Sequence, residues 1–259
     1  MKIPDSQIAV TLFNVCLYCK TESDLDRTLD KLCAIGYQVV QVSAINLAPE
    51  VIRKQLDRHN LYCCATHEGM AAIGADDLSP LVEKLQILGC HFTALGYPPE
   101  EYHTQDGMRK LAKIFNVQGE RLLERGIRLG YHNHDFEFER KDGKTTLLET
   151  FYHTADPKKV CAELDVHWVA RGGGSPVCWI KKLAGRIPVI HFKDFARYNG
   201  EPVFCEIGEG NLDWPGILDA CRETGVDFYS IEQDQPFPGH DIFDSMRISF
   251  DNLRAMGVK

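Results

Sequence analysis

Eight short apolar segments, each followed by an amphipathic stretch, run through this chain of 259 residues. The segments are often β-branched, which is typical of strands buried on both faces of a parallel sheet. Stretches of helical period lie between them, such as Leu25–Ile35, Leu78–Leu88 and Met108–Arg125. Eight strand–helix units in about 250 residues predict a (β/α)8 barrel, or TIM barrel. The expected strands are Ile8–Phe13, Val39–Val42, Leu61–Thr66, His91–Leu95, Ile127–His132, Val160–Asp165, Val189–Phe192 and Phe228–Glu232.

Glycines mark the ends of several expected helices, at Ile35-Gly36, Leu88-Gly89 and Thr224-Gly225. No linker rich in Gly, Pro or Ser interrupts the pattern, so we expect a single barrel domain over residues 1–259. An open doubly wound sheet is the alternative, but it normally has fewer strands and a phosphate loop. No G-x-G-x-x-G follows the first strand and no G-x-x-x-x-G-K-[ST] occurs.

Charge and hydropathy exclude several classes of protein. The net charge of −8 argues against a nucleic-acid binder, which needs a basic face. No run of about 18 apolar residues occurs, so we expect no membrane span. The segment Met-Lys-Ile-Pro-Asp at the start lacks the apolar core of a signal peptide. We therefore expect a cytoplasmic protein, with a homo-oligomer left open.

Four consecutive expected strands end in residues that can hold a divalent metal. In a (β/α)8 barrel the active site lies at the C-terminal ends of the strands, so these side chains should converge. Buried unpaired carboxylates are costly, and a dication removes that cost. Carboxylates combined with imidazoles suit one divalent ion, for which we expect Mn²⁺, with Zn²⁺, Co²⁺ or Mg²⁺ as alternatives. The strand-end motifs are His132-Asn-His134, Glu163-Leu-Asp165, His191-Phe-Lys193-Asp194 and Glu232.

Further polar and aromatic residues are expected around the same barrel mouth. His67 and Glu68 follow the third strand, and Trp168 follows the sixth. We expect His67 and Glu68 to contact substrate, with an ordinary turn residue as the alternative for His67. Trp168 is a candidate for substrate contact, but its residue type also suits the packing of loops over the mouth. Lys193 either pairs with a carboxylate or stabilises a developing oxyanion. Glu163 precedes Asp165 by two positions, and we expect it either to support the ligands or to have a structural role.

Four motifs resemble the xylose-isomerase-like sugar phosphate isomerase/epimerase family, which includes ketose epimerases, hydroxypyruvate isomerase and inosose dehydratase. The resemblance spans nearly the whole chain and is strongest from residue 127 onward. It implies a (β/α)8 barrel with one divalent metal held by strands five to eight. The motifs are Tyr131-His-Asn-His-Asp-Phe-Glu-Phe138, Glu163-Leu-Asp-Val-His-Trp168, His191-Phe-Lys-Asp194 and Gly208-Glu-Gly-Asn-Leu-Asp-Trp-Pro-Gly-Ile-Leu218.

The resemblance also implies a ligand set. Asp165, His191 and Glu232 stand where the family has its ligands on strands six, seven and eight. The strand-five ligand of the epimerases is usually Glu, whereas this chain has His132 there. His134 and Glu137 are the alternatives to His132, which we prefer because it ends the apolar strand.

The activity implied is that of a metal-dependent isomerase or epimerase acting on a sugar or a sugar-derived hydroxy-carbonyl compound through an enediolate. A dehydratase or lyase acting on a keto-sugar or keto-inositol is the alternative. An endonuclease IV-like nuclease and a non-catalytic sugar-binding barrel are less favoured. The candidates for proton transfer or charge stabilisation are Glu232, Lys193, His134 and Glu137.

Overall fold

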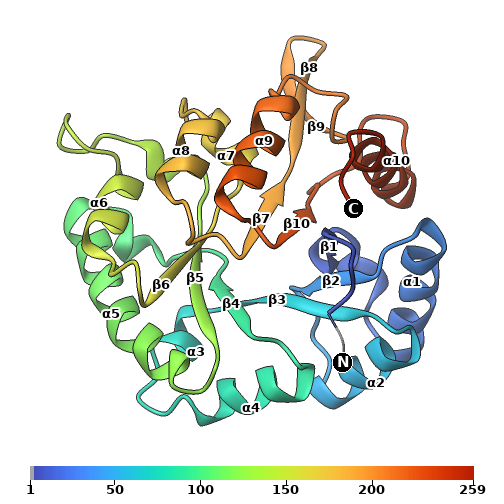
Figure 1. Cartoon of the computed structure of the whole chain (residues 1–259), viewed down its shortest axis with the longest axis horizontal. Coiled ribbons are helices and arrows are strands. Elements are labelled where there is room, and N and C mark those ends of the chain that lie inside the picture. The colour runs from blue at the N-terminus through green and yellow to red at the C-terminus, as the bar shows by residue number, and fades with distance from the viewer. Residues whose placement is uncertain (1–2) are drawn as a thin grey trace.

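A computed structural model describes residues 3–259. Eight parallel strands form one sheet in the order β6-β5-β4-β3-β2-β1-β10-β7. The two end strands meet through a parallel bridge between Asp165 and His191, and the His191 N–H donates to the Leu164 carbonyl over 2.8 Å. The sheet therefore closes into the predicted (β/α)8 barrel, with its helices outside the ring of strands (Figure 1). The strands are β1 (Ile8–Thr11), β2 (Val39–Val42), β3 (Tyr62–Glu68), β4 (Phe92–Leu95), β5 (Arg128–His132), β6 (Val160–Glu163), β7 (Val189–Phe192) and β10 (Phe228–Ile231).

The helices begin and end where local chemistry predicts. Thr21 caps the first helix in a capping box with Asp24. Gly36, Gly89 and Gly225 follow their helices with φ of 124°, 64° and 73°, a region that favours glycine. The helices are α1 (Glu22–Ile35), α2 (Pro49–Arg58), α3 (Met70–Ile73), α4 (Ser79–Leu88), α5 (Gln105–Leu123), α6 (Leu147–Thr154), α7 (Val166–Arg171), α8 (Pro176–Lys182), α9 (Trp214–Thr224), α10 (Ile242–Ala255) and the short 3₁₀ turns η1 (Leu12–Tyr18), η2 (Glu100–Tyr102) and η3 (Phe136–Phe138).

The barrel interior changes character along the strands. Toward the strand starts it holds a small apolar cluster that includes Val39, Phe92 and Val189. Toward the strand ends the buried side chains are polar, among them Gln41 and His191. The outer faces of the strands pack with the helices in a larger apolar core. The apolar cluster supports the polar layer from below, so the polar side chains lie in the part of the barrel where function is expected.

An antiparallel hairpin that the sequence analysis did not predict follows β7. It consists of β8 (Asp194–Tyr198) and β9 (Glu201–Cys205), and it projects beyond the ring of strands in Figure 1. Asn199 and Gly200 make its turn with φ of 49° and 84°. An Asn-Gly pair is the usual two-residue hairpin turn. The hairpin carries Phe195 and Phe204 against the ring of His167.

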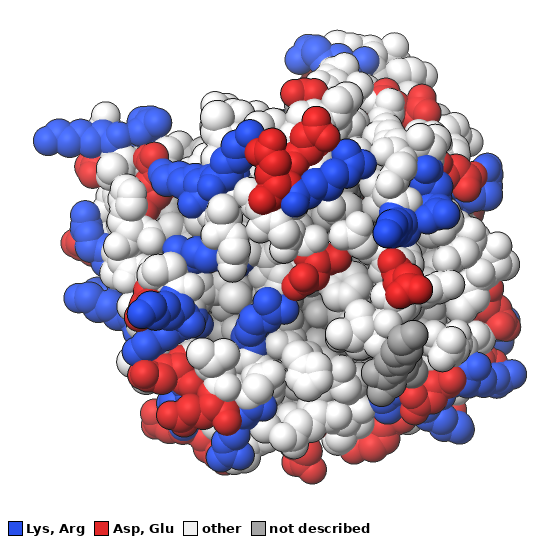
Figure 2. Space-filling view, in the orientation of Figure 1, with Lys and Arg blue, Asp and Glu red and all other residues white. Residues whose placement is uncertain are grey.

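Within residues 3–259, no helix combines the length and the apolar character needed to cross a bilayer. Figure 2 shows Lys and Arg interspersed with Asp and Glu over the visible face of the molecule. Interspersed charges of both signs are typical of a solvated surface.

Candidate metal centre

Four buried side chains from four neighbouring strands converge at the barrel mouth. Each of them offers a ligand atom, and these atoms all lie within 4.8 Å of one another. His132 ends β5, Asp165 caps α7 just after β6, His191 lies in β7, and Glu232 follows β10. Their exposed fractions are 2%, 0%, 0% and 6%. The four residues for which the sequence predicted metal ligation thus lie in a single cluster.

Two atoms of this cluster that could bind an ion lack a hydrogen-bond partner. Asp165 Oδ2 and His191 Nδ1 are buried without one. His191 Nδ1 lies 3.0 Å from Glu232 Oε2, but at an angle unsuited to a hydrogen bond. Buried polar atoms in proteins normally have partners. Two imidazoles and two carboxylates, with unpartnered atoms among them, fit a divalent transition metal.

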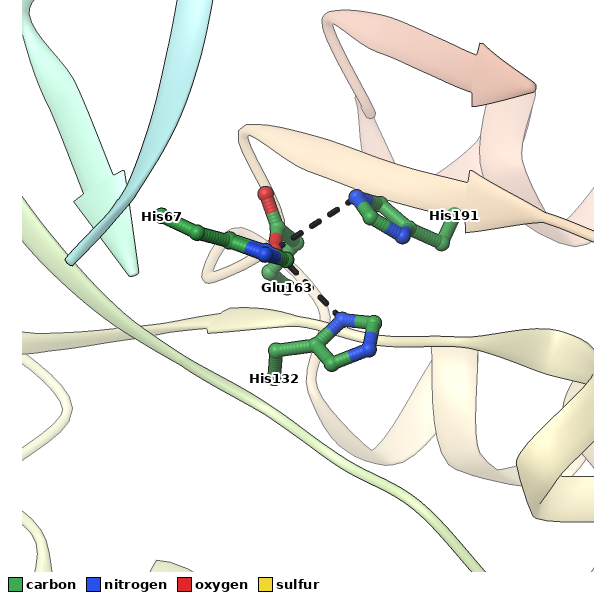
Figure 3. A group of neighbouring side chains, drawn as sticks. All are labelled: His67, His132, Glu163 and His191. Atoms are coloured by element: carbon green, nitrogen blue, oxygen red, sulfur yellow. Dashed lines mark hydrogen bonds and ion pairs between the residues drawn. The ribbon is translucent and has the colours of Figure 1, made fainter. Parts of the chain in front are cut away.

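A second group shares two of these imidazoles. Figure 3 shows the Glu163 carboxylate facing the rings of His67, His132 and His191. Glu163 Oε2 lies 3.4 Å from His132 Nδ1 and 3.5 Å from His191 Nε2, and it contacts His67 Nε2. Glu163 is fully buried. The stretch Glu163-Leu-Asp165 therefore contributes one carboxylate to each group.

These neighbours set the charge of the buried groups. Burial raises the pKa of Glu163, but the charges of His67 and His191 outweigh burial and leave that pKa well below its usual range. Burial lowers the pKa of His191, and Glu163 and Glu232 overcome burial to raise it to about 10. Burial and repulsion by His191 lower the pKa of His132 to about 4. Burial raises the pKa of Asp165 to about 7, against the lowering effect of Lys193.

Lys193 is a buried cation beside the cluster, with 1% of its surface exposed. Its Nζ donates to Glu232 Oε1 over 2.8 Å and lies 2.6 Å from Asp234 Oδ1 and 3.9 Å from Asp165 Oδ2. The ammonium also lies 4.9 Å from the ring centre of Trp168. Burial lowers the pKa of Lys193, but the surrounding carboxylates more than reverse this and raise it. Lys193 is therefore a fixed positive charge at the barrel mouth.

His134 lies on the wall of the mouth. Its ring centre is 5.0 Å from that of His132, 4.9 Å from that of Tyr97 and 5.6 Å from that of Trp168. Its Nδ1 has no hydrogen-bond partner. Burial lowers the pKa of His134 to about 2, so the ring is neutral and can accept a hydrogen bond.

Glu137 belongs to neither metal group found in residues 3–259. Its carboxylate accepts hydrogen bonds from Tyr131 Oη over 2.7 Å and from the His134 N–H over 2.8 Å. Tyr131 points to the outer core, where it stacks on Phe151. Burial raises the pKa of Glu137 to about 8. The short turn η3 thus ties Glu137 to the back of β5 rather than to the cluster.

The two residues predicted after the third strand lie in β3 and face opposite ways. His67 faces Glu163, whereas Glu68 pairs with Lys84 of α4 over 2.7 Å. Successive side chains of a strand alternate between its two faces, which explains the divergence. The structure therefore directs Glu68 toward the helices and His67 toward the cluster.

Two amides position the cluster, and the sequence motifs assigned no role to either. Gln41 Oε1 lies 2.8 Å from His191 Nε2. Asn133 Oδ1 accepts from the Asp165 N–H over 3.0 Å. Gln41 is the single polar residue of the apolar strand β2. A lone polar residue in a buried strand is the sequence signal that could have identified it.

Asp194 explains the Gly208–Leu218 motif. Its carboxylate accepts from Trp214 Nε1 over 2.5 Å and from four backbone N–H groups, which belong to Phe195, Gly208, Gly210 and Leu212. A Cβ at Gly210 would lie 2.2 Å from Asp194 Oδ1. Asp194 is therefore a structural carboxylate that holds the loop before α9, with its charge satisfied by protein donors.

No protein-family model matches the chain. A curated protein named inosose dehydratase, from Lacticaseibacillus casei, is 24% identical over 157 residues, which cover 55% of this chain and 52% of that protein. The chain therefore matches about half the length of this relative.

Solved structures are similar over almost the whole chain. A sugar phosphate isomerase/epimerase from Parabacteroides distasonis ATCC 8503 has a TM-score of 0.82 at 24% identity, covering 99% of this chain and 96% of that one. An L-ribulose 3-epimerase has a TM-score of 0.71 at 17% identity, with 97% and 94% covered. A protein named IOLI, solved with a zinc atom, has a TM-score of 0.70 at 14% identity, with 96% and 97% covered. The chain therefore has the fold of the xylose-isomerase-like TIM barrels, as the sequence resemblance predicted.

Proposed function

We propose that this protein is a divalent-metal-dependent isomerase or epimerase of a sugar or a sugar-derived hydroxy-carbonyl compound. The observation that carries the proposal is the buried cluster of His132, Asp165, His191 and Glu232, whose ligand atoms lie within 4.8 Å of one another at the barrel mouth. The fold does not by itself specify a reaction. The proposal therefore depends on what these side chains can do.

The four residues of the cluster would hold one ion, with Mn²⁺ preferred and Zn²⁺, Co²⁺ or Mg²⁺ as alternatives. When bound, the ion would act as a Lewis acid on a substrate carbonyl and make the adjacent C–H more acidic. Lys193, with its buried ammonium 2.8 Å from Glu232 Oε1, would stabilise the negative charge of the enediolate.

Proton transfer falls to groups on facing walls of the barrel. Glu232 follows β10 and His134 follows β5. In the ring of strands, β7 and β6 lie between β10 and β5. We assign Glu232 to take the proton from the carbon next to the carbonyl. Return of that proton to the former carbonyl carbon, while the hydroxyl proton of the neighbouring carbon passes to the former carbonyl oxygen, gives an isomer. Delivery of a proton to the opposite face of the carbon that lost it gives an epimer. We assign His134, whose Nδ1 is unpartnered, to bind a substrate hydroxyl or to relay the second proton.

A dehydratase or lyase is the second candidate. The strand-five position of the cluster holds an imidazole, His132, where the related epimerases usually have Glu. The matched curated relative is named inosose dehydratase. In this reaction the same proton abstraction is followed by loss of an oxygen substituent from the next carbon, and that oxygen leaves with a proton.

Incubation of Mn²⁺-loaded protein with a panel of ketoses, aldoses and keto-inositols in D2O tests the proposal. We expect deuterium at the carbon next to the carbonyl, detected by NMR, and no incorporation with Asp165→Asn. A rearranged sugar identifies the isomerase or epimerase, and an unsaturated product identifies the dehydratase or lyase. Ligand binding with no deuterium incorporation across the panel would instead favour a sugar-binding barrel. Cleavage of duplex DNA at an abasic site would favour the nuclease.

A further inference from the structure

Glu163 is a buried carboxylate for which the reaction above has no use. Its exposed fraction is 0%. Its Oε2 faces three imidazoles, those of His67, His132 and His191, and its Oε1 has no hydrogen-bond partner. Burying a carboxylate is costly unless nearby groups compensate its charge. The three imidazoles around Glu163 therefore compensate its charge, and two of them belong to the candidate metal centre.

Both shared rings turn one nitrogen toward Glu163 and the other away from it (Figure 3). For His132 the nitrogen facing Glu163 is Nδ1, at 3.4 Å from Oε2. For His191 it is Nε2, at 3.5 Å, and the other nitrogen, Nδ1, lies 3.0 Å from Glu232 Oε2. The nitrogens that turn away from Glu163 are therefore His132 Nε2 and His191 Nδ1.

We propose that Glu163 is a positioning residue that orients both imidazole ligands of the metal. It accepts the Nδ1–H of His132 and the Nε2–H of His191, which leaves His132 Nε2 and His191 Nδ1 free to bind the ion. Metal-binding histidines commonly donate their other ring N–H to a carboxylate, which fixes the tautomer and the ring orientation. In this chain one carboxylate would accept a hydrogen bond from each of the two imidazole ligands. The inference rests on the metal site of the proposed function.

The two imidazoles depend on Glu163 to different degrees. His191 Nε2 also lies 2.8 Å from Gln41 Oε1, so a second acceptor supports its tautomer. His132 Nδ1 has no other polar contact among the described residues than Glu163. Loss of the carboxylate should therefore disturb His132 more than His191.

His67 completes the surroundings of Glu163 from β3. Its ring stacks on that of His191, with 5.4 Å between the ring centres. A Cβ at Gly96 would lie 2.8 Å from His67 Nδ1, so glycine at this position makes room for the ring. His67 thus adds a third imidazole to the surroundings of the Glu163 carboxylate.

Glu163→Gln tests the proposal, because it keeps the shape of the side chain and removes its charge. Titration of ion-free protein with ZnCl2 by calorimetry should give one ion per chain in both proteins and about 10- to 100-fold weaker binding in the variant. Glu206→Gln is the matched control, since Glu206 is also buried and its carboxylate pairs with Ser245 and His240 rather than with either ring. It should leave zinc affinity unchanged. If Glu163→Gln does not fold, Glu163→Asp keeps the charge with a shorter reach and should bind zinc with intermediate affinity.

NMR of ¹⁵N-histidine-labelled protein reports the tautomer of each imidazole. If Glu163 only stabilised the fold, its substitution would leave these tautomers unchanged. We expect His132 as the Nδ1–H tautomer with and without zinc, and zinc-bound His191 as the Nε2–H tautomer. In Glu163→Gln only His132 should lose its preference. Unchanged zinc affinity, or His132 as the Nε2–H tautomer, would overturn the proposal. If the wild type bound two zinc ions and Glu163→Gln bound one, Glu163 would be a metal ligand rather than a positioning residue. A wild type that binds no ion would overturn the proposed function, while the His132 tautomer would still decide the role of Glu163.

Discussion

The two halves of the barrel end their strands with different chemistry. The buried polar residues on β1, β2, β3 and β4 include the neutral Thr11, Gln41, Thr66 and Thr93. Strands β5, β6, β7 and β10 lead into His132, Asp165, His191 and Glu232. From the first half, His67 reaches across to Glu163, and Gln41 reaches across to His191.

The difference shows why the candidate ion site arises in the second half. In the first half, hydroxyls satisfy one another, as when Thr66 Oγ1 donates to Thr93 Oγ1 over 2.8 Å. In the second half, buried ligand atoms such as Asp165 Oδ2 have no partner. A neutral hydrogen bond needs no further partner, whereas buried charge needs a counter-charge. We therefore expect substitutions in the two halves to have separate consequences.

The largest effect is expected from Asp165→Asn. Asn retains the cap of α7, where Asp165 Oδ1 accepts from the Trp168 N–H, but it removes a charged ligand. Metal binding should fall by more than the roughly 100-fold expected for a residue that only supports a ligand. Calorimetric titration with Mn²⁺ measures this, and circular dichroism checks folding. Full metal occupancy in the folded variant would remove Asp165 from the ligand set.

Lys193→Met should keep the metal and lower turnover by about 100-fold or more, because a preorganised positive charge is lost. Lys84→Met is the matched control from the first half, since Lys84 pairs with Glu68 in a more exposed ion pair. Steady-state kinetics of both variants on the substrate found in the panel measures the contrast. Equal turnover in the two variants would exclude Lys193 from the reaction.

Gly210→Ala should destabilise the fold by about 3 kcal/mol, because its Cβ would lie 2.2 Å from Asp194 Oδ1. Asp194 shows that a carboxylate of the second half needs no ion when backbone donors surround it. Gly69→Ala is the control, since no atom lies within 4 Å of its added Cβ. Urea denaturation compares the two variants. Similar stabilities would mean that the loop has room to move away from Asp194.

Glu137 should make stability fall with rising pH. Burial raises its pKa in the folded protein from the ordinary 4.5 to about 8. Between these values the folded state keeps a proton that the unfolded state has released, so the free energy of unfolding falls as pH rises through that window. Glu137→Gln should remove this part of the decline. Urea denaturation at several pH values checks the slope, and parallel curves for the two proteins would contradict the shift.

The smallest effect is expected from Thr93→Val in the first half. It leaves Thr66 Oγ1 without its acceptor and should cost about 1 kcal/mol of stability. Metal affinity should not change, because the pair does not touch the cluster. Denaturation and calorimetry on the same preparation test both statements. Weaker metal binding would show that the two halves are not independent.

The fold was predictable because its signals are local. The eight apolar runs correspond to the eight barrel strands, and Gly36, Gly89 and Gly225 follow helices as expected. The hairpin β8–β9 escaped prediction because its strands are only partly buried and its Asn199-Gly200 turn is a short signal. Strand β3 also extends to Glu68, two residues beyond the predicted end.

The candidate site was predictable in its members but not in their pairings. Position at a strand end is a local property, and it placed His132, Asp165, His191 and Glu232 in one group. The direction of a side chain depends on register and rotamer. For this reason the sequence did not predict that Glu68 faces α4 while His67 faces the cluster. Nor did it predict that Glu137 pairs with Tyr131.

The decisive measurement of the proposed metal site is a crystal structure of protein loaded with Mn²⁺, with anomalous scattering to locate the ion. We expect one ion per chain, bonded to His132, Asp165, His191 and Glu232 at the barrel mouth. An ion bound at other residues, or a fully folded protein that takes up no ion at these four side chains, would contradict it.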